Sequence, residues 1–136
     1  MTTAEKSIAI SEESDIVAAR QRARMFAVEL GFRAMDQSRI TTAVSELARN
    51  VVRYANNGEG RVHLREIRDD GRVGIEILVE DEGPGIPNID KAMEQGFSSG
   101  TGLGLGLGGT KRLMDEMLIE SAPGTGTRIT IRKWRH

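Results

Sequence analysis

The sequence contains no cysteine, which excludes disulfide bonds, thiol catalysis and thiolate metal sites. It also has no apolar run close to the roughly 20 residues that a membrane-spanning helix needs. The residues that follow Met1 are polar, and they do not form a signal peptide. These absences predict a cytoplasmic protein that does not associate with a membrane.

The chain also lacks an excess of either charge. Its 19 Lys and Arg residues balance 20 Asp and Glu residues, for a net charge of -1. A nucleic-acid-binding protein typically carries a basic face or stripe, so we expect no nucleic-acid partner. A basic cluster does lie near the end of the sequence: Arg128, Arg132, Lys133 and Arg135. Because alternate residues of a strand face opposite sides, we interpret this cluster as a solvated strand edge and not as a binding patch.

Histidine is scarce as well. His63 falls in an expected strand, His136 is the last residue, and neither has a second ligand at metal spacing. What remains is the size and composition of one globular domain: 136 residues, of which 38% are hydrophobic and 29% charged. Because no repeat or linker divides the sequence, we expect a single domain over residues 1–136.

The beginning of the sequence predicts a strand followed by a helix. Residues 4–10 form the expected strand. Apolar residues then recur at helical spacing over 16–30, with Ser11 or Ser14 as the N-cap and Gly31 as the stop.

Two further helices are predicted. One has Asp36 as its N-cap and ends at 56–58, and its apolar stripe has spacings of three and four: Ile40, Val44, Leu47, Ala48, Val51 and Ala55. The other begins within 104–110 and runs to about Met117. A short helical piece is expected near 89–95.

The remaining segments predict two hairpins. Strands at 61–67 and 73–80 flank the sequence Asp-Asp-Gly at 69–71, a strong hairpin signal. Strands at 118–122 and 127–134 flank a turn at 123–126. Helices combined with such hairpins predict an α/β (α+β) two-layer sandwich, with a mixed, mostly antiparallel sheet and the helices on one face.

Three polar features interrupt this framework. The first is Glu46 with Asn50, four residues apart on one helix face and about 6 Å apart along the helix axis. They flank Leu47 at the edge of the apolar stripe, and are either a solvated pair or a proton acceptor beside a metal or phosphate ligand. Arg49 and Arg53 share a face of the same helix, where they pair with acids or contact a ligand.

The second feature is Asp81, which ends a strand and is followed by Gly83 and Gly85. A carboxylate at a strand end can accept a hydrogen bond from an exocyclic amine, and the glycines let a planar ring approach the backbone. An ordinary turn explains this pattern about as well.

The third feature is a concentration of glycine, since nine of the 16 glycines lie between Gly83 and Gly109. Over residues 100–106 glycine alternates with Thr101, Leu103 and Leu105 ahead of a helix. Successive backbone N–H groups and a helix N-terminus suit a phosphate. The order of residues does not fit a Walker A loop, and no βαβ unit supports a Rossmann fingerprint. A flexible linker is the alternative, although a linker has no reason to keep alternating leucines.

Taken in order, these features resemble the GHKL superfamily, which includes gyrase B, MutL, histidine kinases and the bacterial anti-sigma-type serine kinases. The motifs that carry the resemblance are Glu46-x-x-x-Asn50, Asp81-x-Gly83-x-Gly85, Gly102-x-Gly104-x-Gly106 and Gly126-Thr127. The chain departs from many members by continuing its glycine run through Gly106, Gly108 and Gly109, which weakens the start of the third helix.

The resemblance implies a Bergerat-type ATP-binding fold with ATP and Mg²⁺ as cofactors. Asn50 would ligate the Mg²⁺ that bridges the phosphates, and Glu46 would orient or deprotonate the attacking group. Asp81 would bind the adenine amino group, with Thr127 assisting through water. The other residues implied in cofactor binding, which include the lid over the phosphates, are Gly83, Gly85, Ile86, Gly100, Thr101, Gly102, Leu103, Gly104, Leu105 and Gly106.

Longer strings narrow the resemblance to the stressosome-associated serine kinases over nearly the whole chain: DIVAARQ (15–21), SRITTAVSELARN (38–50), EDEGPGIPNI (80–89), GFSSGTGLG (96–104) and KRLMDE (111–116). Such kinases phosphorylate a STAS-domain antagonist or scaffold protein, and some activate a PP2C-type phosphatase. The expected function is therefore protein serine/threonine phosphorylation in a bacterial partner switch. The alternative is a nucleotide-binding module that binds a phosphatase or sigma factor without phosphoryl transfer.

Overall fold

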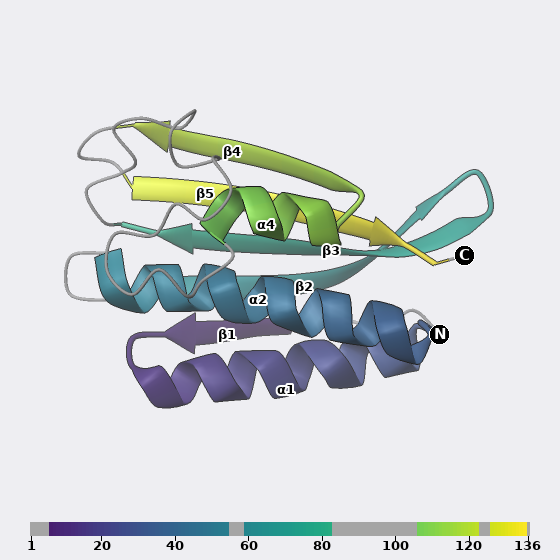
Figure 1. Cartoon of the computed structure of the whole chain (residues 1–136), viewed down its shortest axis with the longest axis horizontal. Coiled ribbons are helices and arrows are strands. Elements are labelled where there is room, and N and C mark those ends of the chain that lie inside the picture. Colours follow the sequence, from purple (N-terminus) through teal and green to yellow (C-terminus); the bar gives the residue numbers. More distant parts are fainter. Residues whose placement is uncertain (1–5, 55–58, 83–105, 123–125, 136) are drawn as a thin grey trace.

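The computed structural model describes residues 6–54, 59–82, 106–122 and 126–135. These segments form three helices and five strands (Figure 1). In chain order they are β1 (Lys6–Ile10), α1 (Glu13–Glu29), α2 (Ala34–Tyr54), β2 (Gly60–Asp69), β3 (Arg72–Asp81), α4 (Gly106–Leu113), β4 (Glu116–Ala122) and β5 (Gly126–Trp134).

The five strands form one sheet in the order β1-β2-β3-β5-β4. Every pair of neighbours is antiparallel, so the expected mixed sheet is antiparallel throughout its described strands. The predicted hairpin at 69–71 is confirmed, because Asp69 of β2 pairs with Arg72 of β3. The two residues between them, Asp70 and Gly71, have φ values of 52° and 82°. Two adjacent residues with positive φ suit the twist of a tight hairpin.

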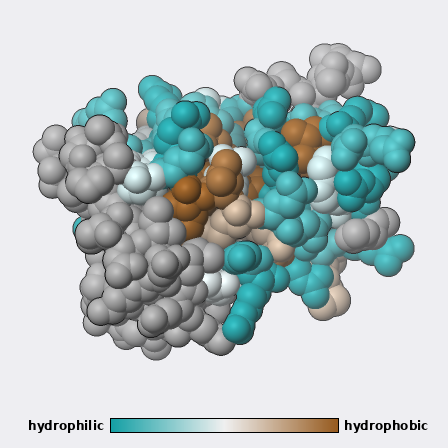
Figure 2. All heavy atoms as spheres, turned by 90° about the horizontal axis from the view of Figure 1, so that it is seen from above, coloured by the Kyte–Doolittle hydropathy of each residue, from teal (hydrophilic) through white to brown (hydrophobic). Residues whose placement is uncertain are grey.

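The helices pack on one face of this sheet, as the two-layer prediction requires (Figure 1). The core lies between the layers, where alternate strand residues such as Ile75, Ile77 and Ile131 and the helix residues Phe26 and Leu47 are 0–1% exposed. The other face of the sheet, called here the outer face, carries mostly charged side chains. Seen from the β4 edge, hydrophobic atoms occupy only small areas among hydrophilic ones (Figure 2).

Two predicted N-caps are wrong. Helix α1 is capped at Glu12, because the Asp15 carboxylate accepts hydrogen bonds from the backbone N–H groups of Ser11 (2.9 Å) and Glu12 (3.1 Å). These two backbone bonds lower the pKa of Asp15. Helix α2 begins at Ala34, which places Asp36 inside its first turn, where the carboxylate binds Arg39 at 2.8 Å.

The third helix is shorter than predicted. Helix α4 ends at Leu113, and Met117 belongs to β4. The chain leaves the helix because the Asp115 N–H donates to the Arg132 carbonyl oxygen (2.9 Å) and the Asp115 carboxylate accepts the Trp134 N–H (2.8 Å). The helical piece expected near 89–95 lies outside the described residues.

The glycines of α4 do not prevent it from forming. The helix starts at Gly106 and continues through Gly108 and Gly109, although each glycine costs about 1 kcal/mol relative to alanine. Packing against α2 offsets this cost, since Leu107 is 4% exposed and Thr110 is fully buried. None of the helices in the described segments is long and apolar enough to cross a membrane.

Candidate nucleotide-binding site

The described motif residues gather at one end of the sheet, called here the motif end. Strand β3 ends there at Asp81, β5 begins there, α2 reaches it with its C-terminal half, and α4 starts there (Figure 1). Segments that are far apart in the sequence therefore meet as the resemblance requires.

Four residues form a straight row across the sheet at the motif end. Gly60 of β2 pairs with Asp81 of β3, Asp81 pairs with Thr127 of β5, and Thr127 pairs with Ser121 of β4. All four lie on the face that packs against the helices, because their neighbours two residues along each strand belong to the core or pack on it. Directly paired residues have Cβ atoms about 5 Å apart, so Asp81 and Thr127 act on the same space.

Two glycines let the backbone close tightly around Asp81. A Cβ added to Gly60 would lie 2.5 Å from the Glu80 carbonyl oxygen and 2.7 Å from Cγ1 of Val51. A Cβ added to Gly126, whose φ is +103°, would overlap the Asp81 carbonyl oxygen. The contact with Val51 also joins the two motifs, because Val51 follows Asn50 directly on α2.

Glu46 lies on α2 one turn before Asn50, and its side chain is 14% exposed. Nη1 of Arg49 donates to Oε1 of Glu46 at 3.1 Å. The acid partner expected for Arg49 is therefore Glu46 itself. Asn50 is partly exposed on the same helix.

Thr127 is held by a hydrogen-bonded neighbour. It is 7% exposed, and its hydroxyl oxygen lies 3.1 Å from Oγ of Ser121, which in turn donates to the Gly126 carbonyl oxygen at 3.2 Å. The sequence reasoning missed Ser121. The turn was expected at 123–126 and no register was predicted for its strands; β5 in fact begins at Gly126, one residue earlier than expected, and pairs Ser121 with Thr127.

Several residues predicted to bind the cofactor lie outside the described segments: Gly83, Gly85, Ile86, Gly100, Thr101, Gly102, Leu103, Gly104 and Leu105. Gly106, the last residue of that run, is the first residue of α4. The N-terminus of a helix favours an anion because its backbone N–H groups point outward and its dipole is positive there.

A pocket of about 600 Å³ opens at the motif end next to Gly60 and Asp81. Its other lining residues come largely from β1 and the outer face, and they carry both charges: Ala9, Ile10, Ser11, Glu59, Arg61, Glu80, Glu82 and Arg128. In the described segments no group of three His, Asp or Glu side chains is arranged to hold a metal ion.

The basic cluster near the end of the sequence is distributed over both faces of β5. On the outer face, Arg128 lies 3.5 Å from Glu80, and Arg132 binds Glu76 at 2.8 Å. On the helix face, Lys133 is buried, and Arg135 beyond the strand donates to the Leu30 carbonyl oxygen at 2.8 Å. The cluster is therefore paired within the chain and forms no continuous basic surface.

Comparison with known proteins supports the same interpretation. Residues 35–135 match the family described as histidine kinase-, DNA gyrase B-, and HSP90-like ATPase. Serine/threonine-protein kinase RsbT of Bacillus subtilis is 54% identical over 127 residues, which are 93% of this chain and 94% of that protein. An anti-sigma F factor of Clostridium acetobutylicum is 35% identical over 133 residues, 94% of this chain and 90% of that protein.

Two solved structures share the fold. The mycobacterial sensor histidine kinase MprB matches with a TM-score of 0.58 and 23% identity, and the match covers 98% of this chain and 99% of that chain. The RsbU and RsbW domains of a Mycobacterium tuberculosis protein match with a TM-score of 0.67 and 22% identity over 98% of this chain, which spans only 34% of that one. The resemblance seen in the sequence is thus confirmed: the chain belongs to the family of histidine kinase-, DNA gyrase B- and HSP90-like ATPases.

Proposed function

We propose that this protein is an ATP-dependent serine/threonine kinase. The observation that carries the proposal is the 54% identity to a protein serine/threonine kinase over nearly the full length of both chains. Retention of both Glu46 and Asn50, on a helix that packs beside Asp81, supports it. A protein that only bound nucleotide would have no need of the Glu46 carboxylate.

ATP would bind at the motif end. The Asp81 carboxylate would accept a hydrogen bond from the adenine amino group, assisted by Thr127 through water. The tight backbone contacts at Gly60 and Gly126 support this role, because they fix the position of Asp81 from both neighbouring strands. The phosphates would extend towards the start of α4, where the helix dipole favours negative charge.

The site also fits a magnesium ion. Asn50 offers an amide oxygen, a hard ligand of the kind that Mg²⁺ prefers, and Mg²⁺ at phosphoryl-transfer sites typically takes few protein ligands, the rest coming from phosphates and water. When bound, the ion would neutralise charge on the phosphates.

Glu46 would position the attacking hydroxyl and accept its proton. Arg49 engages Oε1 of Glu46, and the side chain stays 14% exposed, so a substrate can reach the carboxylate. The serine or threonine oxygen would bond to the γ-phosphorus while the bond from that phosphorus to the β–γ bridging oxygen breaks. ADP would leave, and the hydroxyl proton would pass to Glu46.

The substrate would be a STAS-domain antagonist or scaffold protein in a bacterial partner switch. Similarity to RsbT and to the anti-sigma F factors supports such a partner, because both kinds of protein are regulators. A PP2C-type phosphatase is a second proposed partner, which the chain would bind and activate. Both interactions would take place in the cytoplasm.

Glu46→Gln tests the catalytic assignment. We expect phosphate transfer from labelled ATP to a STAS-domain protein to fall at least 100-fold, because one general base typically contributes 10²–10⁴-fold. The dissociation constant for ADP should stay within about threefold. Asp36→Asn is the matched control, since Asp36 is also the acidic partner of an i,i+3 arginine on α2; it should transfer phosphate normally. Undiminished transfer by Glu46→Gln would falsify the role of Glu46.

A second candidate function is a regulator that binds its partner without phosphoryl transfer; the similarity to proteins named anti-sigma F factors supports a partner-binding role. The same experiment separates the two. A stable complex of the wild-type chain with a partner, without transfer of label in the presence of Mg²⁺ and ATP, would favour the regulator.

A further inference from the structure

Ser121 occupies the outer position of the row at the motif end, and neither the motifs nor the resemblance assigns it a role. It lies on β4 directly opposite Thr127, on the face that packs against the helices. Its Oγ contacts both Gly126 and Thr127. Ser121 therefore contacts Thr127, a proposed base-recognition residue, from the strand opposite to that of Asp81.

The hydrogen bonds around Ser121 have a direction. A carbonyl oxygen can only accept, so the bond of 3.2 Å from Ser121 Oγ to the Gly126 oxygen uses the single proton of the serine hydroxyl. The contact of 3.1 Å between the two hydroxyl oxygens allows either one to be the donor, and both contacts of Ser121 are hydrogen bonds at once only when Thr127 donates. With its own proton turned towards Ser121, the Thr127 oxygen offers lone pairs, and no proton, to a ligand.

Asp81 is a second hydrogen-bond acceptor beside the Thr127 hydroxyl. An ionised carboxylate also offers only lone pairs, and Asp81 is the direct neighbour of Thr127 on the other side. The row therefore presents two hydrogen-bond acceptors side by side. This arrangement suits an exocyclic amine, which has N–H groups to donate, and opposes a carbonyl oxygen at the same place. Adenine carries an amine at that position of the ring, whereas guanine carries a carbonyl.

We propose that Ser121 is a positioning residue that fixes the hydroxyl proton of Thr127 and so increases the preference for adenine over guanine nucleotides. This inference rests on the proposed function, because it assumes that ATP binds at the motif end. Without Ser121, the Thr127 hydroxyl could turn and donate to the guanine carbonyl, directly or through water.

The experiment compares ATP and GTP in the full-length protein. For wild type and Ser121→Ala, the KM and kcat of phosphate transfer and the dissociation constants of both nucleotides are measured. We expect Ser121→Ala to lower the ATP-over-GTP preference about tenfold, the worth of one hydrogen bond, through changed KM values at nearly constant kcat. Ser121→Thr, which keeps the hydroxyl, should restore the preference.

Two controls separate positioning from a structural role. Thr130→Ala removes a hydroxyl from β5, the strand of Thr127, on the opposite face of the sheet, where Thr130 pairs with Leu78 and Leu118; it should leave the preference unchanged. In a Thr127→Val background, Ser121→Ala should have no further effect, because its proposed route runs through Thr127. Ser121→Cys preserves the volume with a weaker donor and tests the proposal if the alanine variant is unstable.

An unchanged ATP-over-GTP ratio in folded Ser121→Ala and Ser121→Cys would overturn the proposal. An equal effect of Ser121→Ala with and without Thr127 would overturn it as well. Failure of the wild-type chain to bind any nucleotide is a different outcome, because it contradicts the proposed function itself.

Discussion

The two ends of the sheet are built in opposite ways. At the motif end, small residues let strands meet backbone to backbone, as at Gly60 and Gly126, and the polar side chains of Asp81 and Thr127 lie next to one another. At the other end, called here the hairpin end, long side chains connect the elements. Lys133 there donates to the Leu113 carbonyl oxygen at 3.0 Å and lies within 4 Å of two carboxylates, those of Asp36 and Asp115.

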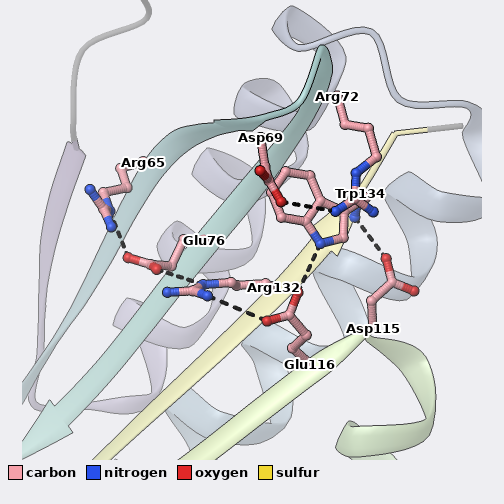
Figure 3. A network of polar contacts seen from close by, with 8 residues as sticks. All are labelled: Arg65, Asp69, Arg72, Glu76, Asp115, Glu116, Arg132 and Trp134. Carbon is pink, nitrogen blue, oxygen red and sulfur yellow. Dashed lines mark hydrogen bonds and ion pairs between the residues drawn. The ribbon is translucent and has the colours of Figure 1, made fainter.

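The outer face continues this network at the hairpin end (Figure 3). Nε1 of Trp134 donates to Glu116 at 2.9 Å, and the guanidinium of Arg72 lies 4.2 Å from the centre of the indole ring. The backbone of Gly74 makes room for the ring, since an added Cβ would lie 2.7 Å from it.

This difference indicates that the hairpin end mainly stabilises the fold and that the motif end mainly serves ligand binding. The contacts of Lys133 join the start of α2, the end of α4 and β5, so the hairpin end fixes how the helices sit on the sheet. The motif end then needs few side chains of its own for stability, and its polar groups can serve a ligand. Changes at the motif end should therefore affect nucleotide binding first, and changes at the hairpin end should affect folding first.

Gly126→Ala should have the largest effect. Its Cβ would overlap the Asp81 carbonyl oxygen, and its φ of +103° is unfavourable for any residue with a Cβ. We expect the free energy of unfolding to fall by about 3 kcal/mol, from overpacking and backbone strain together, and nucleotide affinity to fall at least 30-fold. Urea unfolding followed by Trp134 fluorescence and calorimetric titration with ADP measure the two effects.

Gly71→Ala is the matched control for that variant. Gly71 also has a positive φ, +82°, but an added Cβ would meet nothing within 4 Å. It should therefore cost only the backbone strain, about 1 kcal/mol, and leave ADP binding intact. If the two variants lose the same free energy of unfolding, the close contact between residue 126 and the Asp81 carbonyl oxygen contributes nothing to the loss.

Lys133→Met should have the next largest effect, and on stability alone. The Lys133 side chain is 9% exposed, and its removal leaves the Leu113 carbonyl oxygen without its donor. It also removes a cation from beside the Asp115 and Asp36 carboxylates, of which Asp36 keeps its ion pair with Arg39. We expect a loss of about 2 kcal/mol, with Tm lower by about 5–10 °C in a thermal scan. The Kd for ADP should change by less than about threefold.

Lys6→Met controls for the loss of a cation, since Lys6 is more exposed and lies 3.9 Å from Glu29. It should change stability by less than about 0.5 kcal/mol. A much weaker affinity of Lys133→Met for ADP, at a temperature where the variant is folded, would contradict the division between the two ends.

The sequence predicted the helices and strands well where the apolar periodicity is strong. It predicted their ends less well where a single tertiary contact sets the end of the element. The apolar stripe from Ile40 to Val51 predicted α2 correctly, because all its described members are buried in one core. Asp36 was misjudged as an N-cap, since an acid in the first helical turn has the same local pattern. The end of α4 depends on Asp115 meeting residues of β5, and no local signal reports such a contact.

The candidate site shows the same limit. Glu46, Asn50, Asp81 and Thr127 could be named from motifs, because their types and order are distinctive. Their roles stay predictions. Ser121 could not be found, because its place opposite Thr127 depends on the strand register, and the turn was predicted one residue too long.

The smallest predicted effect concerns Glu76, in the middle of the outer-face network (Figure 3). Burial raises its pKa, but the hydrogen bonds from Arg65 (2.6 Å) and Arg132 (2.8 Å) outweigh burial, so the pKa of Glu76 is lowered. A carboxylate whose pKa is lower in the folded state stabilises the fold fully above its unfolded pKa, about 4.3, and loses that contribution as the pH falls through the folded value.

Glu76→Gln should therefore reduce the free energy of unfolding by about 1 kcal/mol at pH 7, since both arginines remain partly exposed to solvent. The difference from wild type should shrink in urea unfolding experiments as the pH is lowered from 5 to about 3. Glu120→Gln removes an exposed glutamate from β4 and should show no such dependence. A constant difference between Glu76→Gln and wild type across this range would mean that Glu76 acts through packing. In that case the outer face would resemble the motif end, where shape matters more than charge.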